Sequence, residues 1–166
     1  MIERRYRPFS EFEVRAAETG LPVLAGHARV FNVEAEVYGL WREQVAPGAF
    51  KKTIRESDIR ALFNHESSVV LGRNRAGTLT LSEDEIGLSV EIQPPDNEWG
   101  RPVVDAIKRG DVNQMSIGFS VVKQQWVESP DSHTLPLRTI QEARLYDVSP
   151  VTFPAFEATD IGVRSG

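Results

Sequence analysis

The sequence predicts a mainly β domain with a few short helices. Short apolar runs separated by turn-forming residues dominate the chain, and one segment has the spacing of an amphipathic helix. A length of 166 residues suits one domain with its own core. We therefore expect a single α+β domain over 1–166, with an N-terminal strand or arm over 1–20 and a C-terminal tail over 156–166.

The first half of the chain is expected to hold five short strands and one helix. The segment 21–33 is typical of a strand, with Gly26 as the site of a bulge. Pro47 at a first helical position predicts a short helix over 47–54. Further strands are expected at 59–64, 69–72, 77–81 and 88–92, with a turn over 82–87.

The clearest helix is expected over 97–109. Asp96 or Asn97 can cap its first turn, and Gly110 can end it.

Two long strands, 115–127 and 138–151, are expected to form one hairpin. A tip at the centre of the polar turn between them would place Ser116 opposite Asp147. Cβ atoms of directly facing residues lie ~4.5–5.5 Å apart, and those of diagonal pairs ~7–8 Å apart. The serine and the carboxylate are therefore expected in the same neighbourhood.

Composition excludes several kinds of chemistry. The chain has no cysteine, which rules out disulfides, Cys-ligated zinc and a cysteine nucleophile. Its three histidines, His27, His65 and His133, are far apart, so we expect no metal and no cofactor. A net charge of −5 with only short basic clusters argues against a nucleic-acid partner. Without a signal peptide or an apolar run of about 18 residues, we expect no membrane partner and a cytoplasmic location.

Three residues could support hydrolysis by a hydroxyl nucleophile. His65 follows an expected strand, where a base would leave the core. Ser116 begins an apolar strand, and Gly118 after it marks a close approach by a backbone or ligand. Asp147 interrupts another apolar strand and could orient a histidine. Each also has an ordinary structural interpretation as a packed or solvent-facing side chain.

Several segments, in order and with consistent spacing, resemble the prohead maturation proteases of tailed bacteriophages. They are Gly26-His27-Ala28-x-Val30-Phe31-Asn32, Val45-x-Pro47-Gly48-Ala49-Phe50, Phe63-Asn64-His65 with Val70-Leu71-Gly72-Arg73, Gly110-Asp111-Val112-x-x-Met115-Ser116-Ile117-Gly118-Phe119 and Leu145-x-Asp147-Val148-Ser149-x-Val151-x-x-Pro154-Ala155. Together they reach across nearly the whole chain.

This resemblance implies a serine endopeptidase enclosed in the immature capsid, or prohead, in the bacterial host cytoplasm. Such proteins cleave the scaffold or the delta region of the major capsid protein, and often themselves. Their fold is thought to be similar to that of the herpesvirus (assemblin-type) proteases, a closed or partly open antiparallel β-barrel flanked by helices. A homo-oligomer such as a dimer is also implied, because the herpesvirus relatives are activated by dimerisation.

The resemblance also implies roles for individual residues. Carried over by position, Ser116 is the nucleophile and His65 the base. Asp147 is the third member, because phage proteins carry an acid at that place in the last motif. Glu142 and His133 are alternatives, the latter because herpesvirus relatives use a second histidine.

Donors to the oxyanion are expected among the backbone N–H groups of Ile117 and Gly118 and the side chain of Arg144. Two other functions stay open. One is an inactive capsid-assembly or scaffold module with the same fold, which the combination of serine, histidine and acid disfavours. The other is an unrelated metal-dependent hydrolase, which three separated histidines disfavour.

Overall fold

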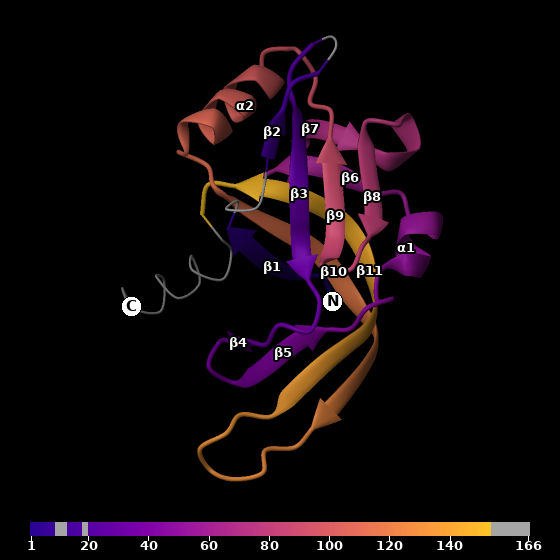
Figure 1. Ribbon diagram of the computed structural model, residues 1–166, viewed down its shortest axis with the longest axis vertical. Helices are drawn as coiled ribbons and strands as arrows, with labels where there is room; N and C mark the ends of the chain where they lie inside the picture. Colours follow the sequence, from indigo (N-terminus) through magenta and orange to yellow (C-terminus); the bar gives the residue numbers. More distant parts are fainter. Residues whose placement is uncertain (9–12, 18–19, 154–166) are drawn as a thin grey trace.

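The computed structural model describes residues 1–8, 13–17 and 20–153 (Figure 1). Within these ranges the chain forms strands β1 to β11 and two α-helices, which confirms the predicted mainly β class with short helices. No helix in the described ranges is both long and apolar enough to cross a membrane. The expected tail over 156–166 lies outside these residues.

The elements follow one another along the chain with these bounds: β1 Glu3–Pro8, β2 Glu13–Arg15, β3 Val23–Val30, β4 Ala35–Val37, β5 Trp41–Val45, α1 Lys51–Glu56, β6 Arg60–Phe63, β7 Glu66–Arg73, β8 Leu79–Glu83, β9 Gly87–Ile92, α2 Gly100–Arg109, β10 Gln114–Val127 and β11 Leu137–Val151.

The strands form two sheets. One has the order β1-β10-β11-β5-β4, with β6 also paired to β11 and β7 to β6; the other has the order β2-β3-β9-β8. In Figure 1 the second sheet lies in front of the upper part of the first. Most strand pairs are antiparallel, as expected, but β11 pairs in parallel with both β5 and β6, so the first sheet is mixed. The pairing of the described strands closes neither sheet on itself, so the barrel stays a prediction.

Alternate side chains of β10 are buried in the core between the two sheets. Met115, Ile117 and Phe119 are at most 2% exposed and belong to the main apolar cluster, together with Val90 and Ile92 of β9. Side chains alternate along a strand. The alternate positions of β10, which include Ser116, therefore lie on the other face of the sheet.

The predicted long hairpin of β10 and β11 is confirmed, and Ser116 and Asp147 lie in the expected neighbourhood, although they do not pair directly. Ser116 pairs with Ser149, and Asp147 pairs with Gly118. The pairing already differs from the expected one by one residue next to the turn, where Val127 pairs with Leu137, and three register shifts along the ladder add one more. One of these shifts leaves Tyr146 as an extra residue on β11. Asp147 consequently lies diagonal to Ser116, within the expected neighbourhood.

Helix α1 begins later than Pro47 predicts. Gly48 has a φ of +93°, so residues 47–50 form a turn rather than the first helical turn. The carboxylate of Glu83 on β8 accepts the N–H groups of Gly48 and Phe50, both at 2.8 Å. A distant strand therefore holds the turn that leads into the helix.

Helix α2 confirms the expected helix, but it begins at Gly100 rather than at residue 97. Asn97 Oδ1 accepts the N–H groups of Trp99 at 3.2 Å and Gly100 at 2.9 Å, and Gly110 ends the helix with a φ of +83°.

A buried ionic cluster joins the edge strand β1 to β5 and β11. Glu43 is 0% exposed, and its carboxylate lies 2.8 Å from Arg5 Nε, 3.3 Å from Arg29 Nη2 and 3.4 Å from Arg138 Nη1. Burial opposes the ionisation of Glu43, but the hydrogen bond and charge of Arg5, with the charge of Arg29, outweigh it and lower the pKa of the carboxyl.

Candidate active site

His65 lies in the two-residue turn between β6 and β7. Asn64 and His65 both have left-handed backbone, with φ of 55° and 58°, as a type I′ hairpin turn requires. Asn64 fixes this turn to the end of β11: its N–H donates to the carbonyl of Pro150 at 2.9 Å, and its Oδ1 accepts the N–H of Thr152 at 2.8 Å. The turn therefore holds the imidazole beside the end of the β10–β11 ladder.

Ser116 comes to His65 from the central strand β10. Its Oγ lies 2.8 Å from His65 Nε2. Ser116 is 0% exposed, and the His65 side chain is only 5% exposed. The hydroxyl and the imidazole are thus shielded from water.

Asp147 reaches the other side of the same imidazole. Its Oδ2 lies 2.6 Å from His65 Nδ1. The parallel pairing of Asp147 with Arg60 places β6 beside β11, and the turn after β6 therefore brings His65 to the carboxylate. One histidine bridges the serine and the acid, with one ring nitrogen directed to each.

Gly118 leaves the space that Asp147 occupies. A Cβ atom on Gly118 would lie 2.3 Å from Asp147 Oδ1 and 3.8 Å from His65 Nδ1. The sequence indicates a close approach at this glycine, and the approaching group in the structure is the carboxylate.

Ser149 is a neighbour that the sequence interpretation did not assign to the site. Its Oγ donates to Asp147 Oδ2 at 2.5 Å, and the residue is 0% exposed. The available signal was the spacing of Asp147 and Ser149, since residues i and i+2 of a strand share a face.

The alternative third members lie elsewhere. Glu142 forms an ion pair with Lys123 at 3.7 Å. His133 is in the exposed hairpin turn at the far end of the ladder, where its N–H donates to Asp131 Oδ1. The structure does not bring either side chain to His65.

His27 also lies apart from the site, with its Nε2 2.6 Å from Asp84 Oδ2. Among the described residues there is no group of three or more His, Cys, Asp or Glu side chains arranged to hold a metal ion.

The expected oxyanion donors differ in their surroundings. Ile117 and Gly118 pair with β1 on one side and β11 on the other. In a strand flanked on both sides, the N–H groups point in the plane of the sheet toward a neighbour. Arg144 is exposed, and its guanidinium lies 5.5 Å from the centre of the Tyr146 ring.

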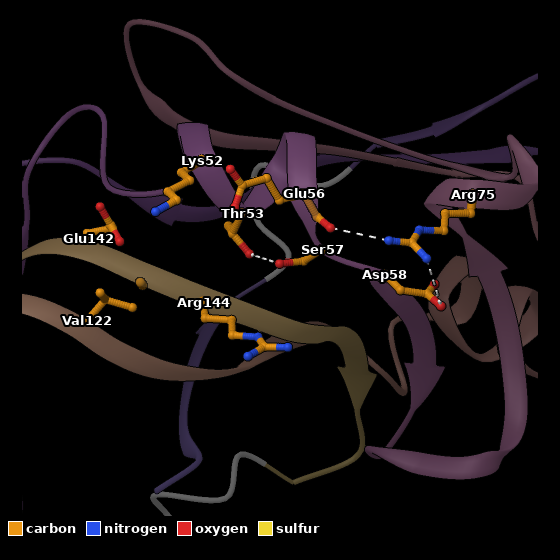
Figure 2. Close-up of a pocket in the computed structure, with 10 residues that line it drawn as sticks. Lys52, Thr53, Glu56, Ser57, Asp58, Arg75, Val122, Glu142 and Arg144 are labelled. Carbon is orange, nitrogen blue, oxygen red and sulfur yellow. Dashed lines mark hydrogen bonds and ion pairs between the residues drawn. The ribbon is translucent and has the colours of Figure 1, made fainter.

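A recess of about 450 Å³ lies beside Arg144, between α1 and β11 (Figure 2). Its charged lining residues are of both signs: Lys52, Glu56, Asp58, Arg75, Glu142 and Arg144. None of Ser116, His65 and Asp147 lines it. The recess adjoins the site along β11 and contains no part of the three-residue chain of hydrogen bonds.

Comparisons with known proteins point to one family. A sequence model described as caudovirus prohead serine protease matches residues 10–166. The prohead protease of Enterobacteria phage HK97 is 31% identical over 158 residues, which cover 92% of this chain and 65% of the relative. The chain thus spans about two thirds of that relative's length.

The fold is similar to that of a solved structure, the bacteriophage T4 capsid assembly protease. The two share a TM-score of 0.50 with 14% identity, over 93% of this chain and 97% of the other. A family match over most of the sequence, together with the order of its motifs, leads to one assignment: the chain belongs to the caudovirus prohead serine protease family.

Proposed function

We propose that the chain is a serine endopeptidase in which Ser116 is the nucleophile, His65 the general base and Asp147 the residue that orients the histidine. The observation that carries this proposal is the single imidazole with its nitrogens 2.8 Å from Ser116 Oγ and 2.6 Å from Asp147 Oδ2. A serine hydroxyl is a weak nucleophile until a base within ~2.6–3.2 Å takes its proton. Membership of the family supports the same roles.

The hydrogen bonds give each residue a step. Asp147 accepts the Nδ1–H of His65, which leaves the Nε2 lone pair directed at Ser116. As Oγ attacks the scissile carbonyl, its proton moves to Nε2, and the carboxylate stabilises the imidazolium. The imidazolium then donates that proton to the leaving amine, and water releases the acyl group by the same route.

Arg144 is the donor proposed for the oxyanion. The developing charge needs a donor beside it. The N–H groups of Ile117 and Gly118 are expected to be engaged by neighbouring strands, whereas Arg144 is exposed and forms no ion pair with any described residue. Its flexible side chain can turn toward a bound peptide.

The proposed substrate is the scaffold or the delta region of the major capsid protein, with self-cleavage as a second reaction. The enzyme would act inside the prohead in the bacterial host, as a dimer or another homo-oligomer, and with a fold akin to the herpesvirus proteases. The similar proteins of phages HK97 and T4 are a prohead protease and a capsid assembly protease, and they support this setting.

Co-expression with the major capsid protein of the same phage tests this function. Wild type should shorten the capsid protein, and Ser116→Ala should not. Ser120→Ala is the matched control, because Ser120 lies on the same strand but contacts Tyr146 instead of His65. Intact capsid protein with wild type and Ser116→Ala alike, both folded, would favour the inactive assembly module.

A further inference from the structure

We propose that Ser149 is a positioning residue of the active site, which holds the carboxylate of Asp147 in the orientation that His65 requires. This inference rests on the proposed function and extends the chain of hydrogen bonds to a fourth residue.

One oxygen atom carries the argument. Asp147 Oδ2 accepts the hydroxyl of Ser149 at 2.5 Å and also lies 2.6 Å from His65 Nδ1. The serine donor comes from the same strand as the aspartate, whereas the histidine comes from the β6–β7 turn. The oxygen is therefore held between its own strand and the turn that carries His65.

The surroundings of the other carboxylate oxygen, Asp147 Oδ1, show why Asp147 needs a second hydrogen-bond donor to fix its orientation. Asp147 Oδ1 occupies the space over Gly118, a residue that has no side chain to confine it. The terminal torsion of an aspartate is broad, so one hydrogen bond to His65 alone would leave the carboxylate free to turn. Ser149 removes that freedom.

Burial strengthens the interaction. Ser149 is 0% exposed and Asp147 is 8% exposed, so water competes little for either group. Hydrogen bonds to a charged partner are stronger than neutral ones, and a low local dielectric strengthens them further. Ser149 also faces Ser116 across the ladder, so it is tied directly to the strand pair that carries the nucleophile.

The test uses a fluorophosphonate probe, which needs no knowledge of the natural cleavage site. Ser116 Oγ bonds to phosphorus, fluoride leaves, and His65 takes the hydroxyl proton. The maximal labelling rate, kinact, depends on activation of the serine, whereas KI reports binding of the probe. Ser149→Ala should lower kinact about tenfold and leave KI unchanged, because Ser149 does not touch the probe.

Three further variants separate positioning from folding. Ser149→Thr restores the hydroxyl and should recover kinact, and Ser149→Cys keeps the size with a weak donor and should give an intermediate rate. Ser120→Ala removes a hydroxyl that contacts Tyr146 at 3.1 Å and should leave kinact unchanged. Melting temperatures and the final labelled fraction show how much of each protein is folded.

Two results would overturn the inference alone: labelled wild type with an unchanged kinact in folded Ser149→Ala, or an equal loss in Ser120→Ala. A wild type that is folded but unlabelled would overturn the proposed function, and this inference with it.

Discussion

Gly118 and Asp147 face each other across β10 and β11, and the missing side chain of the one provides the space for the other. A Cβ atom on Gly118 would stand 2.3 Å from Asp147 Oδ1, far inside van der Waals contact. The glycine is therefore as much a part of the site's geometry as the residues that form its hydrogen bonds.

Gly118→Ala should abolish most activity at little cost in stability. The added methyl group displaces the end of a short side chain rather than the backbone, so the aspartate can turn away without unfolding the sheet. Misplacement by about 1 Å can lower a catalytic rate about 10²-fold. Fluorophosphonate labelling rates and thermal melting would check both parts.

Gly72→Ala is the control for Gly118→Ala. A Cβ there would lie 2.7 Å from the backbone carbonyl of Thr78, away from the three site residues. This variant should lower the melting temperature and retain the labelling rate of its folded fraction. The role given to Gly118 would be contradicted if Gly118→Ala kept its labelling rate and lost stability while Gly72→Ala lost its labelling rate and stayed stable.

Asp147→Asn should slow the reaction strongly, because an amide cannot stabilise the imidazolium and can select the wrong tautomer. The equivalent change costs about 10⁴-fold in kcat in a well-studied serine protease. Glu142→Gln and His133→Ala should leave the rate unchanged, since neither residue contacts His65. If the reaction rate fell in Glu142→Gln or His133→Ala but was retained in Asp147→Asn, the substituted residue, rather than Asp147, would be the one that orients His65.

Glu43→Gln should destabilise the fold by about 3–5 kcal/mol, because the cluster of arginines around it would lose its buried counter-charge. Glu34→Gln is the exposed counterpart, in which a surface pair with Arg42 is lost, and should cost at most about 1 kcal/mol. Urea denaturation compares the two free energies of unfolding. Similar small losses would show that the buried cluster contributes little.

Asp58 should make stability depend on pH at the acid end. Hydrogen bonds from Arg73 hold the pKa of the Asp58 carboxyl at about 2, below its ordinary 3.8. A depressed pKa means that the stabilisation is present above about pH 4 and is lost as the pH falls toward 2. Asp58→Asn should therefore have a lower urea midpoint than wild type at pH 7, and the gap should narrow between pH 4 and 2. A constant gap would be inconsistent with this ion pair, and exposed Asp105→Asn serves as control.

Local pattern was enough to predict the mainly β class, helix α2 and the β10–β11 hairpin, because each depends on periodicity and caps nearby in the chain. Strand β5 escaped prediction since Glu43, a buried charge, interrupts its apolar residues, and only distant arginines make that burial tolerable. The bulge expected at Gly26 instead lies between His27 and Arg29.

The details of the site depend on contacts that are distant in sequence. Thr53 Oγ1 of α1 accepts the N–H of Leu145 at 3.0 Å, beside the extra residue that shifts the register of β11. The start of α1 depends in the same way on Glu83 of β8. A symmetrical hairpin drawn from sequence contains neither contact, so it brings Ser116 near Asp147 but does not give the observed pairing of Ser116 with Ser149.

The most direct test of Ser116 as the nucleophile is to measure the mass of the intact protein after exposure to a fluorophosphonate and then to map the modified peptide. We expect one adduct per chain, located on Ser116, and none on the folded Ser116→Ala variant. An adduct on another residue, persistent labelling of Ser116→Ala, or no labelling of folded wild type would contradict the assignment of Ser116 as an activated nucleophile.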